Sequence, residues 1–168
     1  MARQTRKRVA FISSYPPIRC GIATFCSDLV CSISAASEGQ FEPLVVAMRS
    51  DDQHYDEPVK FEIRQNVKKD YISAADYINF SHVDLVSVQH EFGLFGGEAG
   101  SYLNLLLNRL KPAIITTLHT VLHDPSPDHH KCLVDTCNAS YKVITMNERG
   151  VGMLREIYGI SEKKIGLI

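Results

Sequence analysis

The chain has 168 residues, of which 45% are hydrophobic and 22% charged, and its formal net charge at pH 7 is −1. This length and composition predict one globular domain with a hydrophobic core of its own. The nearly neutral charge argues against a general nucleic-acid-binding protein, whose surface is normally basic, so we expect no nucleic acid among the partners.

Positive charge is dense only at the N-terminus, in Arg3, Arg6, Lys7 and Arg8. We interpret residues 1–8 as a flexible basic tail, with a weak contact to an acidic membrane surface as the alternative. The apolar stretch that follows is interrupted at Ser13 and again at Pro16, too early for a signal peptide or a membrane span. The five cysteines contain no C-x-x-C motif. Together these features predict a cytoplasmic protein with free thiols, with the inner membrane face as a peripheral alternative.

The first half of the chain alternates strand and helix patterns. Residues 9–12 predict a buried strand. The apolar residues that follow it recur at spacings of three and four, as in an amphipathic helix: Ile22, Phe25, Leu29 and Ile33. That helix should end near Gly39. Residues 43–48 predict a second buried strand, residues 61–64 a short exposed strand and residues 71–80 a helix.

The second half continues the alternation with clearer helix signals. Apolar strands are predicted at residues 85–88, 113–116, 141–145 and 164–168. A leucine stripe predicts a helix over 103–110 that ends before Pro112. Ser126 followed by Pro127 is typical of a helix start, and Asn147 could cap a last helix that stops at Gly159.

Strands that are continuously apolar and separated by helices predict a parallel sheet covered on both faces. The expected fold is therefore a Rossmann-like, three-layer α/β/α domain over residues 9–168. Because the chain stops on an apolar strand, we also expect it to be one domain of a longer protein.

Three polar, Gly- or His-bearing segments follow three of the predicted strands, at residues 15–25, 89–98 and 117–121. In open α/β sheets, ligands bind outside the carboxyl ends of the strands. The three segments therefore predict one shared cleft.

The first of these segments carries Gly21 as its only glycine. A nicotinamide dinucleotide site would need G-x-G-x-x-G there, so that site is disfavoured. A single glycine in front of a helix N-terminus still suits a phosphate or another anion, and Arg19 could add donors. The alternative is a tight turn with Gly21 at positive φ and Arg19 in solvent.

The other two segments carry histidines. His90 and Glu91 are neighbours on an extended chain, so at most one of them need face the cleft, and a solvated loop is the alternative for both. His119 ends a strand, where it could bind a sugar hydroxyl, act in acid–base chemistry or satisfy a buried carbonyl. Nothing makes it converge with His123 and the two histidines near residue 130, so no metal site is expected.

Taken together, these segments resemble the N-terminal domain of retaining GT-B glycosyltransferases of family 4 (group 1), which include many mannosyltransferases. The resemblance spans nearly the whole chain. It is carried by residues 15–25, by 89–97, by 117–121, and by the closing segment 146–159.

The resemblance implies a two-domain enzyme in which this domain mainly holds the acceptor and a C-terminal domain holds the donor. The turn at Gly21 and Ile22, with Arg19, would lie near the donor diphosphate and the acceptor. His119 matches the catalytic-site histidine that reaches the donor sugar near its 6-hydroxyl. Three further residues would line the acceptor pocket, namely His90, Glu91 and Gly93.

The substrates implied are a GDP- or UDP-sugar and an acceptor that is a sugar, lipid-linked or another hydroxyl compound. No cofactor or metal is implied. Since the chain ends before any donor-binding half, we expect it to be inactive alone. The alternatives are a non-catalytic binding or regulatory module derived from a transferase half, and a nucleotide-sugar epimerase domain.

Overall fold

A computed structural model describes residues 6–49 and 54–168. Within them, seven strands form one sheet in the order β3-β2-β1-β4-β5-β6-β7, and every neighbouring pair is parallel. The strands are β1 (Lys7–Ser13), β2 (Phe41–Arg49), β3 (Val59–Arg64), β4 (Leu85–His90), β5 (Ala113–Leu118), β6 (Lys142–Thr145) and β7 (Ile165–Leu167). The helices are α1 (Gly21–Ala36), α2 (Lys68–Phe80), α3 (Leu103–Leu107), α4 (Pro127–Ala139) and α5 (Glu148–Glu156). Three short 3₁₀ turns are η1 (Phe92–Leu94), η2 (Glu98–Gly100) and η3 (Glu162–Lys164).

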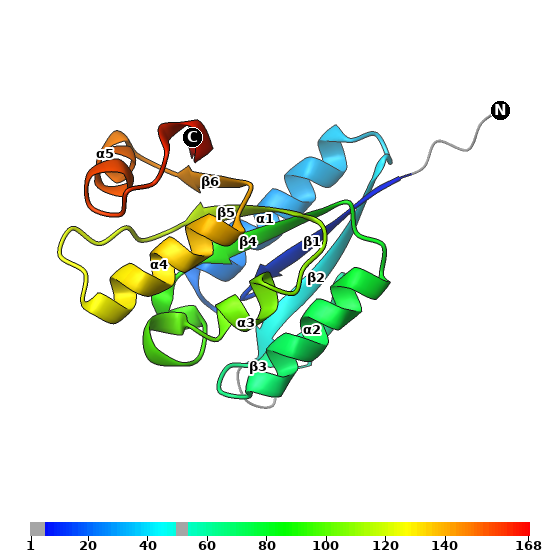
Figure 1. Cartoon of the computed structure of the whole chain (residues 1–168). Helices are drawn as coiled ribbons and strands as arrows, with labels where there is room; N and C mark the ends of the chain where they lie inside the picture. Colours follow the sequence, from blue (N-terminus) through cyan, green and yellow to red (C-terminus); the bar gives the residue numbers. More distant parts are fainter. Residues whose placement is uncertain (1–5, 50–53) are drawn as a thin grey trace.

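Helices cover both faces of the sheet, which confirms the three-layer prediction. Helix α1 lies on one face, and α2, α3 and α4 lie on the other (Figure 1). Alternate residues of each strand point to opposite faces, so the sheet contributes side chains to hydrophobic clusters on both of its faces. Val46 and Val88 pack toward α2 and α3, whereas Phe11 and Val45 pack toward α1.

Side-chain caps start three of the helices. The Oγ of Ser126 accepts from the His129 N–H at 3.4 Å, and the Oδ1 of Asn147 accepts from the Gly150 N–H at 2.7 Å, which confirms both predicted starts. The cap of α1 was not foreseen, because it is the thiol of Cys20, whose sulfur accepts from the Ala23 N–H at 3.3 Å.

The predicted helix over 103–110 is shorter than expected. Helix α3 ends at Leu107, and tighter turns follow, in which the N–H groups of Arg109 and Leu110 donate to carbonyls three residues back. The apolar stripe continues through these turns, so Leu110 still packs against the core without being helical.

At the N-terminus, the sheet begins within the segment interpreted as a tail. Lys7 and Arg8 belong to β1, where Asp84 accepts from the side chain of Lys7 and from the backbone N–H of Arg8. Residues 1–5 of that segment lie outside the described residues.

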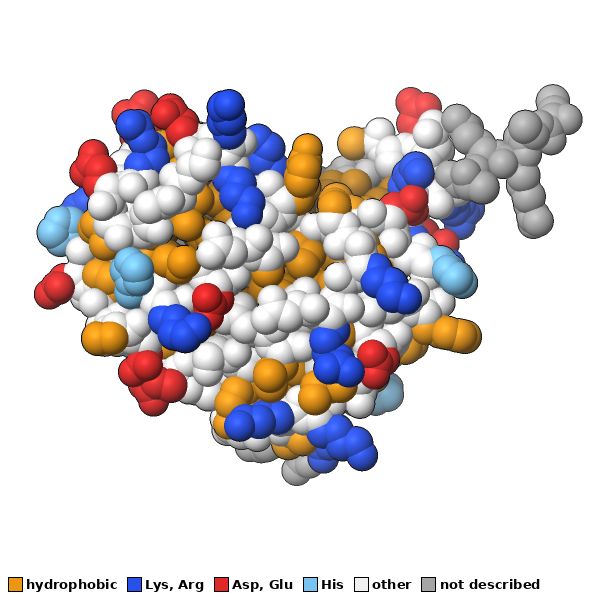
Figure 2. Space-filling model, viewed as in Figure 1, with side chains coloured by type: hydrophobic (Ala, Val, Ile, Leu, Met, Phe, Trp, Pro, Cys, Tyr) orange, Lys and Arg blue, Asp and Glu red, His pale blue; other side chains and the backbone are white. Residues whose placement is uncertain are grey.

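Acidic and basic side chains are interspersed over the face that carries α2, α3 and α4 (Figure 2). Among the described residues seen there, neither sign forms a continuous patch. Over residues 6–49 and 54–168, no helix combines the length and the apolar character needed to cross a membrane.

Candidate functional site

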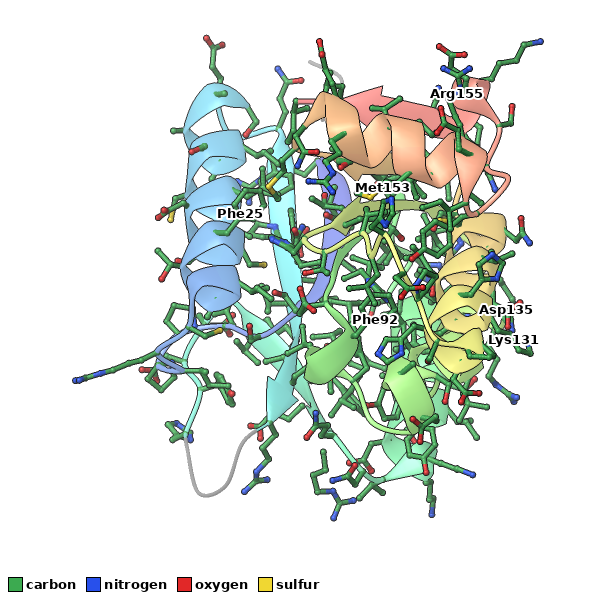
Figure 3. The ribbon with its side chains drawn as sticks, turned by 90° about the vertical axis from the view of Figure 1, so that its left-hand side faces the viewer. Phe25, Phe92, Lys131, Asp135, Met153 and Arg155 are labelled. Atoms are coloured by element: carbon green, nitrogen blue, oxygen red, sulfur yellow. The ribbon has the colours of Figure 1, made fainter. Side chains whose placement is uncertain are left out.

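The strand order places a switch point between β1 and β4. The chain leaves β1 toward β2 on one side of the sheet and later returns to β4 on the other. Crevices at such switch points, at the carboxyl ends of the strands, are where open α/β sheets bind ligands. The segments that follow β1, β4 and β5 all lie at this edge, and Figure 3 views the molecule from the left-hand side of Figure 1, toward which β1 and β4 point.

The first segment leaves the N-terminus of α1 open. Helix α1 begins at Gly21, and a Cβ added to this glycine would meet no atom within 4 Å among the described residues. Gly21 is not one of the glycines at positive φ, so the tight-turn alternative for it is not the conformation found. Arg19 is exposed and Ile22 is half-buried beside it. The positive end of α1 can therefore be approached by an anion.

The second segment divides its side chains between two directions. Gln89 and Glu91 point to the side of α1, and their side chains bond to residues that follow β5. The Oε2 of Glu91 accepts from the Thr120 hydroxyl, and its Oε1 accepts from the backbone N–H of Phe92 at 3.0 Å. Both oxygens of this carboxylate thus hold the loop together.

His90 points the other way and is fully buried. Its ring lies edge-on to Phe92, with centroids 5.0 Å apart, and tilted against Phe95. Neither ring nitrogen has a hydrogen-bond partner within the described ranges. Burial, aided by the nearby His119, lowers the pKa of His90 to about 4. His90 is therefore a neutral imidazole behind the loop.

His119 follows β5 on the same side as α1. Its Nε2 lies 3.0 Å from the Oε1 of Gln89, and its ring is edge-on to Phe25 of α1, with centroids 5.1 Å apart. Burial lowers the pKa of His119, and the charge of Glu91 opposes this only in part. The imidazole is therefore neutral at pH 7. In Figure 3, Phe25 projects from α1 and Met153 from α5 toward the space between the two helices.

Two hollows open at this edge. The first, about 240 Å³, lies in front of His119 and is bounded by Thr120, Asn147, Gly150 and Met153 among others. The second, about 180 Å³, lies between the ends of β1, β2 and β4. Its lining residues are Ser14, Ile18, Cys20, Met48, Arg49, Gln65, Gly93 and Leu94. The amide of Gln65 donates to the carbonyl of Gly93 at 2.8 Å and joins the β3 end to the loop.

Sequence reasoning thus missed Arg49, Gln65 and Gln89. Arg49 is the last residue of β2, and Gln65 directly follows β3. Because all strands are parallel, every polar residue at a strand's carboxyl end was a candidate, and this signal was available. No group of three or more His, Cys, Asp or Glu side chains in the described part of the chain is placed to hold a metal ion.

The buried His90 makes a prediction about stability and pH. In the unfolded chain the pKa of His90 returns to about 6.5. Between pH 6.5 and about 4, His90 is therefore protonated in the unfolded state and neutral in the folded state. The free energy of unfolding has its full value above pH 6.5 and decreases as the pH drops through this window. The decrease is about 2 kcal/mol between pH 7.5 and 5.

Urea unfolding at the two pH values measures this loss. His90→Leu should remove most of it, whereas His123→Gln, at an exposed histidine, should leave it unchanged. An equal pH dependence in His90→Leu and the unmodified chain would show that His90 is not the group responsible.

Comparisons with known proteins support the fold. No protein-family model matches the sequence, and no curated protein matches it either. Among solved structures, the chain is similar to a glycosyltransferase from Rickettsia africae ESF-5, with a TM-score of 0.63 and 17% sequence identity. The match covers 97% of this chain but 42% of the other, so the chain spans about two fifths of that protein. At this identity the likeness concerns the fold, and the chain has the three-layer α/β architecture of one part of a glycosyltransferase.

Proposed function

We propose that the chain is the acceptor-binding domain of a retaining glycosyltransferase that moves a hexosyl group from a nucleotide sugar to a hydroxyl acceptor. The observation that carries the proposal is that His119 and the exposed start of α1 lie at the same edge of the sheet, where Phe25 of α1 packs edge-on against the His119 ring. The fold likeness to a glycosyltransferase and the motifs after β1, β4 and β5 support it.

The chemistry of glycosyl transfer fits these two features. The reaction develops positive charge at the sugar ring and negative charge on the departing diphosphate. The backbone N–H groups of Gly21 and Ile22, which the Cys20 cap does not use, would stabilise the diphosphate, with Arg19 as an additional donor. His119 would accept a hydrogen bond from the 6-hydroxyl of the donor sugar and orient it. In a retaining reaction the departing phosphate can take the acceptor's proton, so the domain need not supply a base.

The acceptor would bind in the hollow between β1, β2 and β4. Arg49, Gln65 and Ser14 are among its polar groups, and Gly93 and Glu91 belong to the loop that closes it. His90 would act from behind this loop, since its own side chain is buried. A lipid-linked, saccharide or other hydroxyl acceptor would each present the hydroxyl that this role requires.

The finer assignment follows the family resemblance. We propose a family 4, mannosyltransferase-like enzyme that uses a GDP- or UDP-sugar in the cytoplasm, with peripheral membrane contact as an option for a lipid-linked acceptor. The donor would be held by a second domain, without a metal or cofactor.

The test is a transfer assay on the protein in the length that its native cells produce. GDP- and UDP-hexoses are offered with sugar and lipid-linked acceptors, and the anomeric configuration of the product is read by NMR. A glycosylated product with retained configuration supports the proposal. Hydrolysis or epimerisation of the donor without transfer, or binding of a protein partner without either reaction, would replace it with one of the two alternatives.

A further inference from the structure

The end of β4 holds the imidazole of His119 in one orientation. Gln89 is fully buried, and its Oε1 lies 3.0 Å from the Nε2 of His119. The backbone N–H of His119 donates to the carbonyl of His90 at 3.0 Å, and Phe25 packs edge-on to the ring. Glu91 fixes the next residue through the Thr120 hydroxyl. The ring therefore has contacts from β4 and from α1.

The contact with Gln89 determines which ring nitrogen carries the proton. An amide oxygen can only accept a hydrogen bond, so the Nε2 that faces it must donate. The Nδ1 of a neutral imidazole is then a lone pair and can only accept. His119 lines the first hollow, and within the described ranges its Nδ1 makes no hydrogen bond, so this nitrogen is left to accept one from a molecule bound there.

We propose that Gln89 is a positioning residue that leaves the Nδ1 of His119 able only to accept a hydrogen bond, so that the site selects a sugar hydroxyl and rejects a carboxylate at the atom facing this nitrogen. This inference rests on the proposed function, in which the 6-hydroxyl of the donor hexose lies there. A hydroxyl can donate a hydrogen bond to Nδ1. The carboxylate oxygens of a hexuronic acid carry no proton, so they would face the lone pair of Nδ1 without a hydrogen bond.

The first experiment needs no activity. The chain is labelled with ¹⁵N-histidine, and the two ring nitrogens of His119 are assigned by NMR at pH 7.5. In the unmodified chain we expect a proton on Nε2 alone. Gln89→Met keeps the length of the side chain but loses the amide oxygen that accepts from Nε2, so both nitrogen signals should shift toward averaged values. A proton on Nδ1 in the unmodified chain, or unchanged signals in Gln89→Met, would overturn the role of Gln89.

If Gln89→Met does not fold, Gln89→Glu gives a second readout. Its carboxylate still accepts from Nε2 and also favours the charged ring. We expect Nε2 to stay protonated and His119 to gain its second proton at higher pH than in the unmodified chain. A titration identical to that of the unmodified chain would show that residue 89 does not control this ring.

The second experiment measures transfer by the native-length protein from donors that carry a hydroxyl, a fluorine or a carboxylate at carbon 6. The kcat/KM should be about 100-fold lower for the carboxylate donor than for the hydroxyl donor. It should also be lower for the fluorine donor, because fluorine cannot donate a hydrogen bond. Gln89→Met should narrow this discrimination, and Gln89→Glu should improve the use of the carboxylate donor.

These outcomes separate the inference from the function on which it rests. Transfer that treats hydroxyl and carboxylate donors alike would overturn the selection while the proposed function stands. Failure with every donor would contradict the proposed function, and the hydroxyl selection with it. The tautomer measurement would then still decide whether Gln89 controls His119.

Discussion

Replacing Gly96 with alanine should destabilise the fold by about 3 kcal/mol, at the upper end of what overpacking costs. A Cβ at this position would lie 1.9 Å from the backbone carbonyl oxygen of Gln65, and backbone cannot move aside as a flexible side chain can. Tyr71 holds both partners in place, since its hydroxyl donates to that same carbonyl and accepts from the Gly96 N–H. Urea unfolding of the chain measures the loss.

Gly93→Ala is the matched control, because it lies in the same loop and a Cβ there would meet no atom within 4 Å among the described residues. Its free energy of unfolding should stay within about 1 kcal/mol of the unmodified value. If both variants lost the same stability, the loop would not be fixed against Gln65 as the structure has it. The control matters for function too, since Gln65 and Gly93 line the same hollow.

The second large effect is expected on activity. His119→Ala should lower the kcat for sugar transfer by the native-length protein by about 100-fold. The variant loses the imidazole nitrogen that would accept a hydrogen bond from the donor sugar and orient it. The free energy of unfolding should change little by comparison, since the ring is half-buried at the rim of a hollow. Steady-state transfer kinetics and urea unfolding of the same preparations test both statements.

His123→Ala supplies the control for this experiment. His123 lies four residues further along and is exposed. Its loss should leave transfer within about twofold, as expected for a surface position without a site contact. Equal losses in the two variants would point to a general effect of the segment after β5, and an active His119→Ala would remove His119 from the site.

Local patterns in the sequence predicted most of the secondary structure. Ser126 and Asn147 start helices because each side chain bonds an N–H only three residues away, a contact that needs no tertiary partner. The helix over 103–110 was overestimated for the converse reason. Its leucine stripe reports burial, and burial continues through the tighter turns that end at Leu110.

The arrangement of the cleft depended on distant partners. The sequence placed polar segments after β1, β4 and β5, and the parallel sheet brings their starts to one edge. Alternation along β4 predicted that His90 and Glu91 would diverge, and they do. It could not predict that His90 would be the buried one, because that depends on Phe92 and Phe95 folding back over it.

The sequence by itself determined the strands and helices, and with them the layers of the fold, because the spacing of apolar residues and the helix caps depend on only a few neighbouring residues. It also determined which strand ends carry polar groups. The tertiary structure alone decided what those groups do. Gln89 controls His119 only because β4 and β5 are neighbours in a register that pairs Gln89 with Thr117, two residues before His119. The state of that imidazole depends on burial and on partners far away in sequence, which no local pattern encodes.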